Sequence, residues 1–235
     1  MLIVSIETSG RHGSVALCRG DQHRFEVFEL APLEGGSYSA TLVPRIAGIL
    51  QSSGLKKTDI DGVVVVSGPG SFTGLRVGLA TAKGLCEALQ RPLAAISMLE
   101  ALAVTYGRAG STALLALDAG RGEVYAGEYE IGAGTARKVQ EYIRKLPDFI
   151  TFALTTQAEI FTPEASLASA LQQASANVKL VEPLQADITG RIGLRKLLAG
   201  EISDLATVDV NYIRRSDAEI FSSPSAHDHP SGNTR

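Results

Sequence analysis

Short apolar runs, separated by polar turns, dominate the first third of the chain. Three strands are predicted at residues 2–6, 13–18 and 24–30, because each run is short and bounded by turn-forming residues. A run of four valines at residues 63–66 fits a strand that is buried on both faces. These runs favour an α/β protein in which strands precede the first helix.

Two amphipathic segments interrupt the strands. The first predicts a helix over residues 39–51, with an apolar face formed by Leu42, Ile46, Ile49 and Leu50. Pro44 lies inside this segment and predicts either a kink or a helix start close to it. The second helix follows a glycine-rich loop and is expected over about residues 72–89.

The order strand-strand-strand-helix-strand-helix is complete by about residue 107 and then begins again. Residues 114–126 repeat the pattern of residues 2–16, an apolar strand that ends in an acid, followed by a glycine-flanked turn and a second strand. Two lobes of the same design are therefore predicted, over residues 1–107 and 108–221. A chance likeness between two hairpins is the alternative.

Further elements are expected between and after these segments. They are strands at residues 93–96, 138–143 and 178–181, and helices within 147–158, at 165–173 and at 188–198, the last stopped by Gly200. Ser97 and Glu100 have the spacing of a capping box at a helix start. Residues 222–235 lack apolar side chains and are expected to be disordered.

The composition is that of an ordinary globular protein, with 45% hydrophobic and 20% charged residues in 235. The longest purely apolar run is far too short to span a bilayer, and the N-terminus has no charged leader, so we expect a cytoplasmic protein with no membrane contact. Cys18 and Cys86 are expected to be buried, reduced thiols. A net charge of −3 argues against unaided RNA binding, which needs a basic surface.

The segment at residues 67–84 is the most informative stretch of the sequence. Its glycine-rich start lies between a strand and a helix, where free amides and the helix dipole could hold an anion; a tight turn is the equal alternative. It is neither a Walker A loop nor the dinucleotide fingerprint, since Thr73 stands where the third glycine would be. The candidate nucleotide or anion contacts are Glu7, Gly68, Gly70, Ser71, Asp118 and Arg121.

The helix in this segment contains glycines that need an explanation. Gly78 and Gly84 each cost about 1 kcal/mol relative to alanine in a helix, which a sequence tolerates where another backbone must come close. Gly74, Gly78 and Ala82 recur every four residues and form a smooth stripe. The stripe fits either packing against the chain's own sheet or docking of a second chain.

Residues 67–84 also resemble the signature of the TsaB (YeaZ) family. Residues 2–9, 117–125 and 210–214 match the same family in order and spacing. Glu7 replaces the commoner aspartate, and Tyr38 stands where many members have a histidine.

The resemblance implies an actin-like ATPase (ASKHA) fold, with two RNase H-like lobes of mixed sheets flanked by helices. It implies a non-catalytic scaffold that binds the catalytic paralogue TsaD, joined by the ATPase TsaE, or a second copy of itself when TsaD is absent. That assembly transfers threonylcarbamoyl, supplied as an adenylate by TsaC, to the tRNA adenosine next to the anticodon. ATP and Mg²⁺ would be used by the wider complex, this chain would have no cofactor of its own, and tRNA would be bound only through the complex.

The resemblance also places the partner surface on the first two helices, at about residues 39–51 and 72–89. The candidate partner-binding residues are Leu42, Ile46, Ile49, Phe72, Thr73, Gly74, Leu75, Arg76, Gly78, Leu79 and Ala82.

Catalysis by the chain itself has little support in the sequence. Its four histidines, His12, His23, His227 and His229, include no pair one helical turn apart, so no metal site is expected. An ATP-dependent phosphotransferase or ATPase is the alternative, because Glu7 and Asp118 end the first strand of each expected lobe. A stand-alone RNA-binding module is a third possibility, and the adjacent Arg214 and Arg215 are either a solvated strand end or a tRNA contact.

Overall fold

The computed structural model describes residues 1–156 and 158–211. The expected tail at residues 222–235, the arginines Arg214 and Arg215 and the last two histidines therefore lie outside the described residues.

The first lobe is built on a five-stranded mixed sheet. Its strands are β1 (Leu2–Glu7), β2 (His12–Gly20), β3 (Phe25–Glu34), β4 (Gly62–Gly68) and β5 (Leu93–Ser97), in the order β3-β2-β1-β4-β5. The first three strands form an antiparallel meander, and β4 and β5 run parallel to β1. The helices α1 (Tyr38–Ser52) and α2 (Phe72–Leu89) cover one face of this sheet, and a short 3-10 turn, η1 (Lys57–Asp59), follows α1.

The second lobe repeats this plan in a smaller form. Its strands are β6 (Thr112–Gly120), β7 (Glu123–Ile131), β8 (Ala136–Lys145), β9 (Ile160–Thr162) and β10 (Val178–Leu180), in the order β10-β9-β6-β7-β8. Counted within the lobe, this is again the order third-second-first-fourth-fifth, with helices α4 (Leu146–Thr156) and α5 (Ala165–Gln173) in the places of α1 and α2. The predicted repeat and the two-lobed, mixed-sheet fold class are confirmed.

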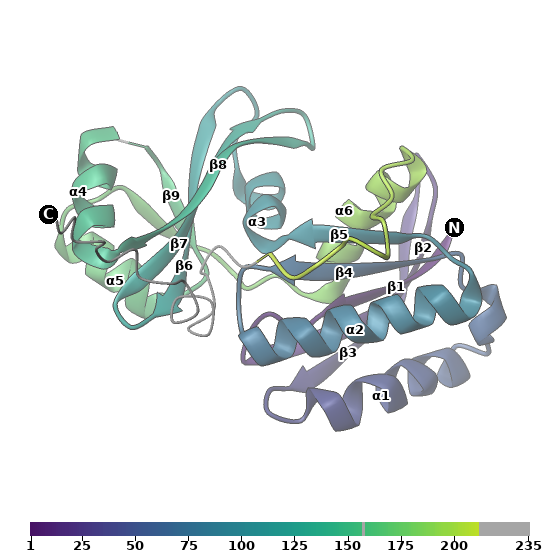
Figure 1. Ribbon diagram of the computed structural model, residues 1–235. Helices are drawn as coiled ribbons and strands as arrows, with labels where there is room; N and C mark the ends of the chain where they lie inside the picture. Colours follow the sequence, from purple (N-terminus) through teal and green to yellow (C-terminus); the bar gives the residue numbers. More distant parts are fainter. Residues whose placement is uncertain (157, 212–235) are drawn as a thin grey trace, which may run out of the picture.

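The last helix of each half packs across the molecule. The helix α6 (Ala186–Leu198) contacts β1, β2, β4 and β5 of the first sheet, whereas α3 (Met98–Tyr106) lies between the lobes and contacts β6 and β7 (Figure 1). The lobe bounds 1–107 and 108–221 stay a prediction; within the described residues, each half contributes its last helix to the sheet of the other half. Small residues make this possible: a Cβ on Gly193 of α6 would lie 2.3 Å from Val64 Cγ1.

The crosswise helices join the lobes through a shared core. Alternate residues of β6 separate into two clusters, since side chains on a strand point to opposite faces. Ala113, Leu115 and Leu117 belong to the core that continues from the first sheet, while Leu114 and Ala116 pack with α4 and α5. The lobes are therefore held together by buried apolar surface as well as by the connecting chain.

Some local predictions need correction. The helix α1 does not start at Pro44 but at Tyr38 and runs through the proline. Half of the capping box is present: Ser97 Oγ accepts from the Glu100 N–H at 3.4 Å, but the Glu100 carboxylate pairs instead with Lys196 at 2.7 Å.

Cys18 and Cys86 are free and buried, as expected. Of the helices that the structure describes, none is long and apolar enough to cross a membrane.

Candidate functional site

The inner faces of α1 and α2 pack against the first sheet. Six of the predicted partner contacts lie on these faces and are buried in the core: Leu42, Ile46, Ile49, Leu75, Leu79 and Ala82. In this chain these side chains are therefore not open to a partner, because the 3.6-residue period identifies the apolar face of a helix without saying what covers it. Here the chain's own sheet covers it.

The glycine stripe of α2 also faces inward. A Cβ on Gly74 would lie 2.1 Å from Thr8 O, and one on Gly78 would lie 2.3 Å from Thr8 Oγ1. The Thr8 hydroxyl donates to Gly74 O at 2.8 Å, which fixes the helix against the end of β1. The stripe exists for internal packing, so docking of a second chain at Gly74, Gly78 and Ala82 is corrected to a close helix–sheet contact.

Three predicted contacts remain on the surface, at the start of α2. Phe72 is 44% exposed, and Thr73 and Arg76 are exposed. The Arg76 guanidinium lies 3.7 Å from the centroid of the Phe72 ring, a cation–π arrangement that leaves both side chains at the surface.

Small and aliphatic residues form much of the remaining exposed surface of α1 and α2, beside Arg45 and Glu87. We call it the outer helix face; its exposed or half-buried members are Ala40, Val43, Pro44, Ala47, Gly48, Val77, Ala80, Thr81, Gly84 and Ala88. A Cβ on Gly48 or on Gly84 would have nothing within 4 Å. The sequence signal for this face is the small and aliphatic residues at the helix positions that lie outside the apolar, buried pattern.

A cavity of about 350 Å³ lies between the lobes, at the ends of their first strands. Four of the predicted anion contacts line it together: Glu7, Gly70, Ser71 and Asp118. Gly68 and Arg121 do not line it, and Gly68 packs instead against the backbone of Asn211.

Three backbone amides at the strand ends beside this cavity are hydrogen-bonded to carboxylates of the chain. Ser9 N donates to Glu7 Oε1 at 2.6 Å, Gly120 N donates to Asp118 Oδ1 at 2.7 Å, and Asp118 N donates to Glu164. Burial raises the pKa of both Glu7 and Glu164. Amides that would have to hold a phosphate thus face three carboxylates, an arrangement that disfavours an anionic ligand.

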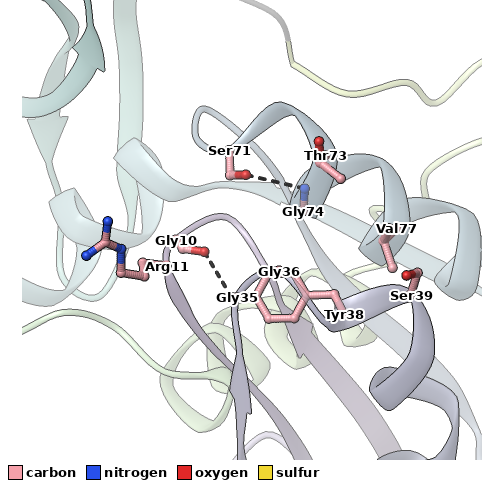
Figure 2. A pocket seen from close by; sticks show the side chains of 10 residues that line it. All are labelled: Gly10, Arg11, Gly35, Gly36, Tyr38, Ser39, Ser71, Thr73, Gly74 and Val77. Atoms are coloured by element: carbon pink, nitrogen blue, oxygen red, sulfur yellow. Dashed lines mark hydrogen bonds between the residues drawn. The ribbon is translucent and has the colours of Figure 1, made fainter.

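A second cavity of about 510 Å³ opens where α1 and α2 begin (Figure 2). Tyr38 lies at its side and donates from its hydroxyl to Gly10 O at 2.9 Å, while Arg11 extends away from it. Burial, and then the charge of Glu7, raise the pKa of Tyr38 to about 12, so its hydroxyl remains a donor at neutral pH. Tyr38 therefore ties the first helix to the loop after β1.

Neither cavity has the donor set of a metal centre. Within residues 1–156 and 158–211, no group of three histidine, cysteine or acidic side chains could hold a metal ion. His12 lines the cavity between the lobes, and His23 lies in the turn between β2 and β3.

Comparison with known proteins identifies the family. The family model described as TsaD, tRNA N6-adenosine threonylcarbamoyltransferase, matches residues 35–189, well over half of the chain. The TsaB protein of Escherichia coli is 37% identical over 132 residues and that of Bacillus subtilis 32% over 139, which is 55% and 59% of this chain. The chain belongs to this family, in its TsaB (YeaZ) branch. It spans about half the length of these two TsaB relatives, 55% and 59%.

Two solved structures from Pseudomonas aeruginosa share the fold over almost the whole chain. YeaZ from Pseudomonas aeruginosa aligns with a TM-score of 0.69 at 22% identity and covers 88% of this chain and 96% of its own. A second Pseudomonas aeruginosa structure, described as similar to peptidase YeaZ, aligns with a TM-score of 0.71 at 22% identity and covers 91% of this chain and 99% of its own. At this identity the likeness shows the fold alone.

Proposed function

We propose that this chain is a non-catalytic scaffold subunit in tRNA threonylcarbamoyladenosine formation and binds a TsaD-type catalytic partner through its outer helix face. The relatives that it matches are named for this pathway, and the matching family model is named for the transferase. The proposed assembly is cytoplasmic, includes TsaE, and uses ATP and Mg²⁺ outside this chain. The same face binds a second copy of the chain when the catalytic partner is absent.

The observation that carries this proposal is the open space at Gly48 and Gly84. Both glycines lie inside helices and are exposed, and nothing within 4 Å requires them to lack a side chain. Each costs about 1 kcal/mol relative to alanine in an isolated chain. A partner that brings its own backbone close to these two helices accounts for the cost, whereas the inward glycines are explained by the sheet.

The rest of the outer helix face suits helix-on-helix packing. Val43 is 57% exposed in the middle of α1, and its neighbours on the surface are alanine, proline and glycine. The charged residues of the two helices are Arg45, Arg76, Lys83 and Glu87. Close approach of two helix pairs needs short side chains with few charges, and this surface provides both.

The cavity between the lobes supports a role without catalysis. In an ATPase of this fold class the strand-end loops must offer free amides to phosphates, but here carboxylates of the chain accept from them. The alternative function, an ATPase or phosphotransferase, predicts magnesium-dependent ATP turnover by the isolated chain that is lost in Asp118→Asn. We expect the isolated chain to be inert in a turnover assay with ATP and Mg²⁺.

The test is a substitution that fills the open space at Gly84. In Gly84→Leu the affinity for the TsaD-type partner should fall at least about 100-fold, because the added side chain holds the backbones apart at a closely packed interface. Formation of threonylcarbamoyladenosine by the reconstituted components should fall with it. Affinity is measured by calorimetry, and the thermal midpoint of the variant reports whether it is folded.

Ser169→Leu provides the matched control, since it adds an exposed leucine to α5 of the second lobe. It should leave partner affinity and tRNA modification unchanged. Full affinity in a folded Gly84→Leu variant would contradict the proposed interface.

A further inference from the structure

A second charged surface lies away from the outer helix face. The turn between β2 and β3 and the C-terminal half of α6 enclose a shallow cavity of about 160 Å³. Its lining is Asp21, Gln22, His23, Arg24, Phe25, Arg191, Leu194 and Arg195. We call it the turn–α6 surface; it brings together residues about 170 positions apart in a chain whose net charge is −3.

The turn–α6 surface carries three arginines and a histidine but a single carboxylate. Asp21 Oδ1 accepts from the backbone N–H groups of His23 at 2.8 Å and Arg24 at 3.0 Å, and these bonds, the largest causes, lower the Asp21 pKa. The carboxylate therefore serves the turn. In the described part of the chain, Arg24, Arg191 and Arg195 form no ion pair with a carboxylate.

Helix stability alone does not explain these charges. Arg195 and Lys196 lie in the last turn of α6, where cations interact favourably with the helix dipole, and Lys196 also pairs with Glu100. That reasoning does not extend to His23 and Arg24, which come from the hairpin facing the helix. Like charges gathered on one surface repel each other unless an anion lies between them.

Two of the guanidinium groups are held in place. Arg191 lies 4.9 Å from the centroid of the Phe25 ring, and Arg195 Nη1 donates to Gly134 O at 3.2 Å. Guanidinium groups fixed in this way lose less conformational freedom when they bind, and their planar forks match the oxygens of a phosphate.

The turn–α6 surface and the outer helix face can be occupied at the same time. On β1, Ile6 faces α2: its Cγ2 lies 3.6 Å from where a Cβ on Gly78 would be. The neighbouring Ser5 faces α6: its Cβ lies 3.0 Å from where a Cβ on Gly190 would be. Successive side chains on a strand point to opposite faces, so α6 covers the face of the sheet opposite to α1 and α2 (Figure 1).

We infer that the turn–α6 surface contacts the sugar–phosphate backbone of tRNA in the assembled complex, an inference that rests on the proposed function. Charge complementarity is its basis: three arginines and a histidine share the single carboxylate of Asp21 around a cavity open to solvent, on a chain whose net charge is −3. The surface supplies a local cationic contact and leaves the main tRNA affinity to the partner, which agrees with the net charge of −3.

The experiment measures tRNA affinity of the full complex by fluorescence anisotropy across a range of salt concentrations. In Arg24→Glu/Arg191→Glu the slope of log affinity against log salt should become shallower by about 2, since each lost phosphate contact removes about one released counterion. Affinity at low salt should fall roughly tenfold or more. Partner affinity and the thermal midpoint should stay at the wild-type values.

The matched control is Lys145→Glu/Lys179→Glu, which changes the net charge equally at exposed positions of the second lobe. It should leave the slope unchanged. An unchanged slope in the arginine variant, or an equal change in both variants, would overturn the inference and leave the proposed function intact. Loss of partner binding in the arginine variant would show a protein contact at this surface and also overturn it. Partner binding by the wild-type chain, measured first, tests the proposed function separately.

Discussion

The two lobes have the same strand order but differ in what their helix pairs show to solvent. In the first lobe α1 and α2 are 15 and 18 residues long, and alanine, valine, proline and glycine make up about half of their exposed positions, beside Arg45, Arg76 and Glu87. In the second lobe α4 and α5 have 11 and 9 residues and contain no glycine, and their exposed positions are largely threonine, serine and glutamine. The same architecture thus carries an apolar, small-residue surface in one copy and an ordinary hydrophilic surface in the other.

This difference separates the helix residues that folding requires from those that it does not require. An amphipathic helix pair over a five-stranded sheet is common to both lobes, so its buried face is a requirement of folding. Exposed glycines occur only in the first lobe's pair, at Gly48 and Gly84. The sheet does not require them, whereas the partner that we propose at the outer helix face would account for them.

The largest expected effect on stability comes from comparing the buried Gly78 of α2 with the exposed Gly84 of the same helix. Gly78→Leu should lower the free energy of unfolding by about 3 kcal/mol or more, because even its Cβ would lie 2.3 Å from Thr8 Oγ1 in a packed core. Gly84→Leu should not lower it at all, since its side chain enters open space. Urea unfolding of both variants measures the two values.

A similar loss of stability in both variants would contradict the distinction between the buried Gly78 and the exposed Gly84, because it would mean that Gly84 also packs against the chain. Loss of partner binding in Gly78→Leu is not informative by itself, since the variant is expected to unfold at least in part.

The sequence could predict the elements of this fold because their signals are local. Residues 72–89 and 165–173 were predicted with the same limits as α2 and α5, since capping serines, glycines and helical periodicity act within a few residues. The repeat of the two halves was visible for the same reason. Among the described elements, the strand β9 (Ile160–Thr162) and the 3-10 turn η1 were not predicted, because each has three residues and is shorter than the usual sequence signals.

What the sequence could not predict depends on contacts between distant segments. A helical glycine indicates a close approach but not the approaching group: Gly78 meets Thr8, 70 positions earlier, and Gly193 meets Val64. The crosswise exchange of α3 and α6 also follows from tertiary packing. The predicted anion contacts did converge, at Glu7, Gly70, Ser71 and Asp118, but the carboxylate of Glu164 that accepts from Asp118 N was not foreseen.

The joint between the lobes should give the next largest effect. Glu141 on β8 accepts from Ser97 Oγ at 2.6 Å, Tyr129 OH at 2.5 Å and Asn211 Nδ2 at 2.9 Å, and its side chain is 6% exposed. Glu141→Leu leaves three donors without an acceptor and should lower the free energy of unfolding by about 2–3 kcal/mol. Chemical denaturation followed by circular dichroism measures it.

Glu130→Leu is the control for this change, because it removes an exposed ion pair with Arg137 on the same pair of strands. Its effect should stay below about 1 kcal/mol. Equal losses in the two variants would show that Glu141 does not join the lobes.

The strand-end acid of the first lobe gives a pH-dependent prediction. Burial raises the pKa of Glu7 above its ordinary value of 4.5, so the folded chain binds more protons than the unfolded chain as pH rises past 4.5. The contribution of Glu7 to stability is therefore present below pH 4.5 and is lost at higher pH.

Glu7→Gln should be the more stable protein at pH 7 and should match the wild type at pH 4 or below. Unfolding curves across this range measure the difference, and a wild-type chain that gains stability relative to the variant with rising pH would contradict the assignment.

The smallest expected effect is a change in the stability of the isolated chain, and it tests the contrast between the helix pairs of the two lobes. Gly84→Ala should raise the free energy of unfolding of the isolated chain by about 1 kcal/mol, because alanine is the better helix former and its Cβ meets nothing within 4 Å. In α5, Ala170→Gly should change stability in the opposite direction by a similar amount. A chain that becomes more stable alone but binds its partner less tightly would show that Gly84 serves the interface at the expense of the fold. If Gly84→Ala instead destabilised the isolated chain, the outer helix face would have an intramolecular role, and the contrast between the two helix pairs would lose its functional meaning.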